Sequence, residues 1–192
     1  SDPCLASSGV NSKSNLYPVL RNLKYVVDRS MTEETLVTRY NNFYEFGSHK
    51  NIAPAAQAMK IDPWQILIDG EVEKVTKIDI NDLLRQMPLE ERVYRFRCVE
   101  AWSMIVPWYG FQLSELLKFL EPETDTKYIS FKTFFDPGVA FNQKQTWYPW
   151  PYQEIITLEE ANNPLAFIAT GLYGKKLPNQ NGAPIRLVLP WK

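Results

Sequence analysis

The residues best able to do chemistry surround one cysteine, Cys98, which follows Arg95 and Arg97 in the segment Arg-Phe-Arg-Cys-Val-Glu. Nearby positive charge favours the thiolate, which is the form of cysteine that binds a soft metal ion. Glu100 lies two positions further on, so an extended backbone would place its carboxylate on the same side as the sulfur. Two alternatives stay open. Cys98 could be a small core residue, the commoner fate of a free cysteine, and Glu100 an exposed loop residue or a partner of Arg97.

Few other residues offer a catalytic or metal-binding group. The chain has two cysteines and one histidine, whereas a structural zinc site needs four such ligands. The single histidine, His49, lies in a polar loop, where a surface position is favoured. The glycine-rich phosphate-binding motifs of nucleotide-binding proteins do not occur. A disulfide between Cys4 and Cys98 is disfavoured because the two are far apart and Cys4 lies in a Ser/Gly-rich end.

The charge and hydropathy of the chain exclude several classes of partner. Its 21 basic and 22 acidic residues nearly cancel, so no basic field would attract nucleic acid or an anionic membrane. No apolar run approaches the roughly 18 residues of a membrane-spanning helix. The first 15 residues lack the basic and apolar regions of a targeting peptide, which we expect to be absent from this chain.

Hydrophobic periodicity predicts strands that alternate with short helices. Strands are expected at 64–69, 71–75, 93–98, 128–135 and 185–189, and an apolar stretch at 165–169. Helices are expected at 32–37, at 80–87 behind an Asp79 cap, at 114–120, and after the capping-box pair Thr157 and Glu160. This order, with 14 prolines and long loops, indicates an α+β fold with mixed sheets. We expect residues 1–39 to form an N-terminal arm and 40–192 to form one domain.

Two loops are rich in groups that could bind a ligand. The turn at 179–186 contains Asn181 and Arg186, whose amide and guanidinium could grip a phosphate or the edge of a heterocycle, although a plain turn is the simpler interpretation. The loop from Trp147 to Tyr152 holds four aromatic rings. These rings could form a sugar-binding platform, but half-buried loop packing is the commoner role.

Three separated segments resemble a known family of enzymes. They are Tyr-Asn-Asn-Phe-Tyr-Glu-Phe at 40–46, Leu-Glu-Glu-Arg-Val-Tyr-Arg-Phe-Arg-Cys-Val-Glu-Ala-Trp-Ser-Met at 89–104, and Pro-Asn-Gln-Asn-Gly-Ala-Pro-Ile-Arg-Leu at 178–187. Together, and in this order, they are similar to the molybdopterin-binding segments of the catalytic subunits of bacterial periplasmic protein-methionine-sulfoxide reductases. The resemblance runs from about residue 40 to 192 and implies the sulfite-oxidase molybdopterin-binding fold.

The resemblance implies a set of site residues and a reaction. Cys98 would be the protein ligand of a single molybdenum held by one molybdopterin, and Glu100 would be catalytic beside it. The positions matching the cofactor contacts are Asn41, Tyr44, Glu45, Thr133, Asn181 and Arg186. The implied reaction is the removal of oxygen from methionine sulfoxide in oxidised periplasmic proteins.

The resemblance also implies partners and a location. Electrons would come from the quinol pool through a haem-containing integral membrane subunit, and export to the periplasm would follow the twin-arginine route. The family continues beyond the position of Lys192 into further phosphate contacts. We therefore expect a chain that stops there to be truncated at its C-terminal end and to hold the cofactor weakly or not at all.

Two other functions remain as alternatives. One is a different oxidoreductase of the sulfite-oxidase fold, such as a sulfite-oxidising enzyme. The other is an interaction or carbohydrate-binding module without a cofactor, which the Trp/Tyr loop at 147–152 would support.

Overall fold

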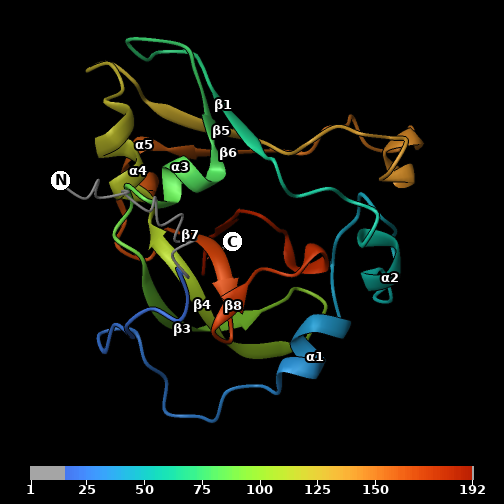
Figure 1. The fold of residues 1–192 in the computed structure, drawn as a ribbon. Coiled ribbons are helices and arrows are strands. Elements are labelled where there is room, and N and C mark those ends of the chain that lie inside the picture. The colour runs from blue at the N-terminus through green and yellow to red at the C-terminus, as the bar shows by residue number, and fades with distance from the viewer. Residues whose placement is uncertain (1–15, 192) are drawn as a thin grey trace, which may run out of the picture.

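The computed structural model describes residues 16–191 and shows short helices arranged around several small antiparallel sheets (Figure 1). The main sheet has the strand order β3-β4-β7-β8, and β9 also pairs with β7. Its strands are β3 (Glu90–Arg97), β4 (Ser103–Gln112), β7 (Phe167–Leu172), β8 (Lys175–Lys176) and β9 (Arg186–Val188). Two separate hairpins complete the strands: β1 (Gln65–Ile68) with β2 (Thr76–Asp79), and β5 (Tyr128–Lys132) with β6 (Gln153–Thr157).

The helices are short; α1 and α2 precede the first strand, and the others lie in the connections between strands. They are α1 (Glu34–Arg39), α2 (Ala53–Ala56), α3 (Ile80–Leu84), α4 (Leu113–Leu120), α5 (Leu158–Asn162) and the 3₁₀ turns η1 (Phe141–Lys144) and η2 (Asn179–Asn181). Two of the predicted caps are present. The Asp79 carboxylate accepts a hydrogen bond from the Asn81 amide, and Thr157 and Glu160 form the reciprocal capping box of α5. No helix among the described residues is long and apolar enough to cross a membrane.

Several predicted strands and helices are confirmed, but one strand was misplaced and three strands, β4, β6 and β8, were not predicted. The predicted return strand at 71–75 is wrong, because β2 begins only at Thr76. Thr76 pairs with Ile68, the last residue of β1, so the loop between the two strands is longer than predicted. The longest of the strands that were not predicted is β4, an interior strand of the main sheet. Residues 105–111 of β4 are all buried, so the alternation of polar and apolar residues that marks a half-exposed strand is missing.

The N-terminal segment pairs with the open edge of β3. The backbone amide of Glu91 donates to the Leu20 carbonyl at 2.8 Å, and the amide of Asn22 donates to the Glu91 carbonyl, also at 2.8 Å. Further along, the amide of Val93 donates to the carbonyl of Tyr25 at 3.0 Å. The described part of the predicted arm therefore lies against the sheet and covers an edge that could otherwise pair with another chain. The predicted domain boundary at residue 40 stays a prediction.

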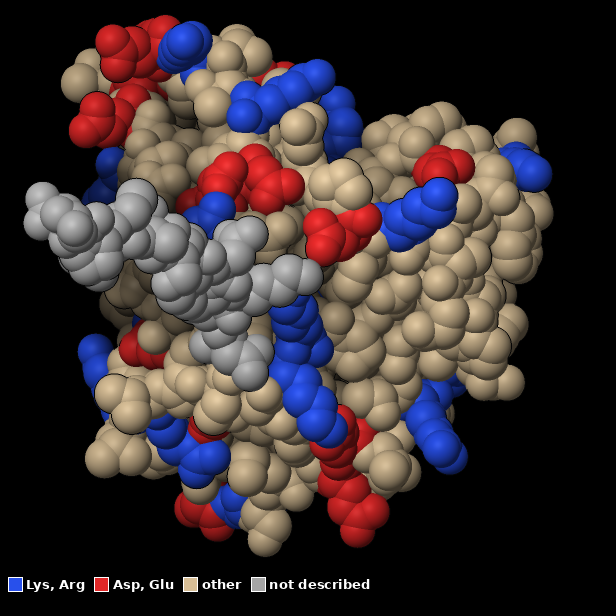
Figure 2. Space-filling view, in the orientation of Figure 1, with Lys and Arg blue, Asp and Glu red and all other residues tan. Residues whose placement is uncertain are grey.

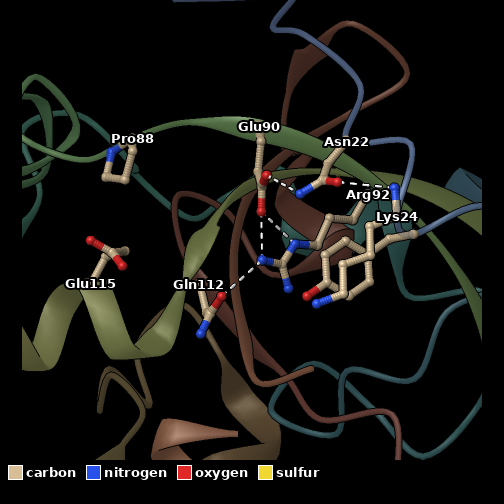
Figure 3. Close-up of a pocket in the computed structure, with 8 residues that line it drawn as sticks. Asn22, Lys24, Pro88, Glu90, Arg92, Gln112 and Glu115 are labelled. Atoms are coloured by element: carbon tan, nitrogen blue, oxygen red, sulfur yellow. Dashed lines mark hydrogen bonds and ion pairs between the residues drawn. The ribbon is translucent and has the colours of Figure 1, made fainter. Parts of the chain in front are cut away.

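A cavity of about 300 Å³ lies between this N-terminal segment and β3 (Figure 3). Asn22, Lys24 and Tyr25 line it on one side, and Glu90 and Arg92 on the other. The cavity is at the start of β3, whereas Cys98 follows the other end of that strand. It therefore lies apart from the sequence-predicted site.

Charged side chains of both signs are interspersed on the face drawn in Figure 2. The right-hand side of that view, where α2 and the turn at 141–144 lie in Figure 1, carries fewer charges.

Gly110 allows β4 and β7 to approach closely at a β-bulge. The register between these strands shifts between Tyr109 and Gly110, and a Cβ at Gly110 would lie 1.9 Å from the backbone oxygen of Ile168. Because that atom belongs to the backbone, the strands would have to separate. We expect Gly110→Ala to lower the free energy of unfolding by roughly 2 to 3 kcal/mol, measured by urea denaturation of this chain.

The matched control for that substitution is Gly138→Ala. A Cβ at Gly138 would come no closer than 3.2 Å to its nearest neighbour, the side-chain oxygen of Asp136. A Gly110→Ala chain as stable as this control would show that the bulge tolerates a side chain.

Candidate functional site

Cys98 lies in the tight turn that joins β3 to β4. Its backbone amide donates to the Trp102 carbonyl at 2.9 Å, and its carbonyl accepts from the Ala101 amide at 3.2 Å. Ala101 has a φ of +67°, a left-handed conformation that costs about 1 kcal/mol or more for a residue other than glycine. The side chain of Cys98 is a free thiol and is half-buried. The structure therefore places the sulfur at the surface of the turn and not in the core; Cys4 lies outside the described residues.

A loop far away in the sequence packs against this turn. The side-chain amide of Asn42 donates to the Cys98 sulfur at 3.5 Å, and the Tyr44 hydroxyl lies 3.5 Å from a carboxylate oxygen of Glu100. Lys50 forms an ion pair with Glu100 and also donates to the side-chain oxygen of Asn42. The predicted pair Cys98 and Glu100 thus shares one site with Tyr44, as the sequence indicated.

The Glu100 carboxylate is held in its charged form. The Lys50 ammonium lowers the pKa of Glu100 most, and the Trp102 indole N–H, 3.2 Å from the carboxylate, lowers it further. The hydrogen bond to Glu100 in turn raises the pKa of Lys50. Glu100 is exposed and ionised near neutral pH, so it serves as a hydrogen-bond acceptor and not as an acid.

A second group of predicted residues meets at the end of α1. The side-chain amides of Asn41 and Asn181 both donate to the Val37 carbonyl, at 2.9 and 3.0 Å. Both side chains are buried, and the side-chain oxygen of each has no hydrogen-bond partner among the described residues. Buried polar atoms are normally paired, so these two acceptors are suited to a ligand that donates hydrogen bonds.

Arg186 connects this second group to the strand that ends at Cys98. Its guanidinium donates to the Asn181 carbonyl at 3.1 Å and lies over the rings of Trp108, at 5.0 Å, and Phe96, at 6.0 Å. Burial lowers the pKa of Arg186 to about 10, so the group stays positively charged at neutral pH. Phe96 is two residues before Cys98 on β3.

Glu45 and Thr133 form the third group. Burial raises the pKa of Glu45, while hydrogen bonds from its own backbone and from the Thr133 side chain act in the opposite direction. Thr133 itself follows β5 and is exposed. All eight predicted residues are therefore placed in three groups, and the segment from Asn41 to Glu45 contributes a residue to each group.

The raised pKa of Glu45 predicts a pH-dependent stability. The folded chain holds this proton more tightly than the unfolded chain, so the contribution of Glu45 is complete below its ordinary pKa of 4.5 and is lost as pH rises through the raised value. Glu45→Gln removes this titration. Relative to the original chain, we expect the variant to gain stability as pH rises above 4.5, as measured by urea midpoints. A difference that stays constant or falls with pH would contradict this assignment.

Three residues at the site were not predicted: Asn42, Lys50 and Trp102. Asn42 stands next to the predicted Asn41 in the first motif, and the sequence gives no signal that one faces the sulfur and the other the end of α1. The cation that contacts the residues next to the thiol, Asn42 and Glu100, is Lys50 from the distant loop. The sequence had instead pointed to Arg95 and Arg97, and both of these side chains are exposed.

The aromatic loop at 147–152 packs beside this site. The Trp147 ring meets Tyr44 and Trp150 edge to face, at 6.4 and 5.6 Å, and Tyr148 stacks on Tyr152 at 5.7 Å. Trp147 nevertheless remains 57% exposed. Since the rings of Trp147 and Trp150 stand at 79° to each other, they do not form one flat platform.

Comparisons with known proteins identify the family of this chain. A model of the family described as "Oxidoreductase molybdopterin binding domain" matches residues 52–192. The protein-methionine-sulfoxide reductase catalytic subunit MsrP of Pseudomonas syringae pv. tomato is 50% identical over 170 residues, which cover 87% of this chain and 50% of that relative. The chain therefore spans about half the length of this relative. The resemblance seen in the three sequence motifs is confirmed.

A solved structure confirms the fold. The sulfane dehydrogenase SoxCD from Paracoccus pantotrophus superposes with a TM-score of 0.54 at 15% sequence identity, over 84% of this chain and 49% of that chain. At this identity the likeness supports the fold alone, and it agrees with the predicted α+β architecture of the sulfite-oxidase type. The match of the family model over residues 52–192 shows that the chain belongs to the oxidoreductase molybdopterin-binding domain family.

Proposed function

We propose that this chain is the cofactor-holding part of a molybdenum-dependent reductase of methionine sulfoxide in oxidised proteins. The observation that carries the proposal is the half-buried Cys98 thiol, with the Asn42 amide 3.5 Å from its sulfur and the Glu100 carboxylate in the same turn. The 50% identity to a protein-methionine-sulfoxide reductase catalytic subunit supports the choice of substrate over that of a sulfite-oxidising relative.

The residues present fit a pterin cofactor with a thiolate-bound metal. Asn41 and Asn181 each offer a buried oxygen without a partner, which suits the amino and ring N–H groups of a pterin. Arg186 offers a half-buried positive charge that suits a phosphate, and Cys98 offers a soft ligand for molybdenum. Tyr44, Glu45 and Thr133 would complete the contacts to the cofactor.

When bound, the molybdenum cofactor supplies two-electron oxygen-atom transfer. The chain supplies the positioning. The Cys98 thiolate would hold the metal at the surface of the turn, and Asn42 would donate a hydrogen bond to that sulfur. Glu100, already ionised, would keep Trp102 and Lys50 in place beside the open side of the site. Because this side of the turn is exposed, a methionine sulfoxide on another protein could approach it, and solvent could supply the protons that leave with oxygen as water.

The proposed partners and location are those that the family resemblance implies. We propose that electrons arrive from the quinol pool through a haem-containing integral membrane subunit, and that the enzyme works in the periplasm after twin-arginine export. The identity to the MsrP catalytic subunit supports this proposal.

Metal and pterin analysis tests the proposal directly. We would measure molybdenum and pterin per chain in this 192-residue chain and in a version extended beyond Lys192, both made in a host that produces the cofactor. The loaded protein would then be assayed for methionine sulfoxide reduction and for sulfite oxidation with redox dyes. One molybdenum per extended chain with sulfoxide reduction is expected. Absence of the cofactor from both would overturn the proposal, whereas sulfite oxidation alone would assign a different reaction within the family.

A further inference from the structure

Asn42 lies between the Cys98 sulfur and the Lys50 ammonium. Its side-chain nitrogen is 3.5 Å from the sulfur, and its side-chain oxygen accepts a hydrogen bond from Lys50. Lys50 also forms an ion pair with Glu100, and the side chains of this pair are 22% and 36% exposed. One lysine therefore contacts two residues that lie next to the thiol.

An asparagine amide can be turned by half a rotation with almost no change in shape. In one orientation it directs an N–H at the sulfur, and in the other it directs an oxygen, which would repel a thiolate. A cation on the far side favours the orientation whose oxygen faces the cation. We propose that Lys50 is a positioning residue that fixes the Asn42 amide so that it donates to Cys98; this inference rests on the proposed role of Cys98 as metal ligand.

The backbone holds Lys50 in the position that this role requires. The Asn41 amide donates to the Lys50 carbonyl at 3.3 Å, which closes the loop from 41 to 50. Within that loop Phe43 and Gly47 form a β-bridge, and α2 begins soon after it at Ala53. Lys50 is thus attached to the same closed loop as Asn42 and reaches the Cys98 turn only through its side chain.

A hydrogen bond to a metal-bound thiolate reduces the electron donation of the sulfur and raises the reduction potential of the metal. If Lys50 is replaced, only the hydrogen bond from Asn42 to Glu100 still favours this amide orientation, and the hydrogen bond to the sulfur is weakened. Lys50→Met in the full-length, molybdenum-loaded enzyme should therefore have a lower midpoint potential. Its turnover should fall roughly tenfold, the lower end of the range for residues that orient a metal ligand.

The test is a potentiometric titration followed by electron paramagnetic resonance of the loaded enzyme. Lys50→Arg keeps a cation and should restore most of the potential and turnover. Lys118→Met is the control, because Lys118 forms a similar lysine–glutamate pair with Glu115 on α4, outside the site, and should behave as the original enzyme. Should Lys50→Met not fold, Lys50→Gln is titrated in its place.

A double substitution shows whether Lys50 acts through Asn42. Asn42→Ala should lower the potential by itself, and adding Lys50→Met should then lower it little further. Fully additive shifts, or an unchanged potential in Lys50→Met, would overturn the inference. Failure of the original loaded enzyme to reduce methionine sulfoxide would instead overturn the proposed function, since the potentials can be measured without turnover.

Discussion

Replacing Cys98 with serine in the full-length protein is expected to abolish methionine sulfoxide reduction, with a loss of more than about 100-fold. A serine hydroxyl is a hard, neutral group and replaces the soft thiolate that molybdenum would bind. Loss of a residue that only orients a ligand costs up to about 100-fold, so loss of the ligand itself should cost more. Turnover with a reduced dye and molybdenum content per chain are the measurements.

The fold should survive this substitution, because the thiol is half-buried and lies in a turn outside the core. Val99→Ser is the matched control, since Val99 is the next residue in the same turn and is 99% exposed. It should keep both activity and metal. Turnover retained by Cys98→Ser at full molybdenum content would show that another group holds the metal.

Replacing Arg92 with methionine is expected to lower the free energy of unfolding of this chain by about 3 to 5 kcal/mol. The Arg92 side chain is only 2% exposed and forms an ion pair with Glu90. It also donates to the hydroxyl of Tyr94 at 2.9 Å and to the carbonyl of Pro164, and its guanidinium lies 3.9 Å from the centre of the Tyr25 ring. Figure 3 shows its contacts with Glu90 and Gln112. Without Arg92, the buried Tyr94 hydroxyl and the partly buried Glu90 carboxylate each lose a donor.

Urea denaturation of this chain measures the effect, with Arg85→Met as the control. Arg85 pairs with Asp82 on the surface, where both side chains are more than half exposed, and such pairs contribute about 1 kcal/mol or less. A loss in Arg92→Met no larger than in this control would show that the buried contacts of Arg92 do not stabilise the fold.

The parts of the fold that could be predicted depend on local rules. Period-two alternation predicted the strand that ends before Cys98, and side-chain chemistry predicted the caps at Asp79 and Thr157. β4 escaped prediction because it is buried on both faces and contains Pro107. The position of β2 depends on the length of a loop that carries no strong turn signal after Gly70.

The residues of the candidate site also differ in whether local sequence could predict them. Cys98 and Glu100 could be singled out because they lie in one short segment, and the resemblance supplied the other candidate residues. Lys50 could not, because its role depends on a contact with Glu100 across the fold. No local sequence pattern indicates which of Asn41 and Asn42 faces the sulfur, because the directions of these side chains depend on how the loop from 41 to 50 packs against the Cys98 turn.

The contact between Asn42 and Cys98 joins positions 56 residues apart. In an unfolded chain these two segments are separated by the residues that form α2, the β1–β2 hairpin, α3 and β3, so the Asn42 amide does not reach the sulfur. A binding site for a metal rarely exists before its protein folds. The surroundings of the sulfur therefore exist only in the folded chain, so any ligand that contacts both segments would bind the folded chain and stabilise it against unfolding.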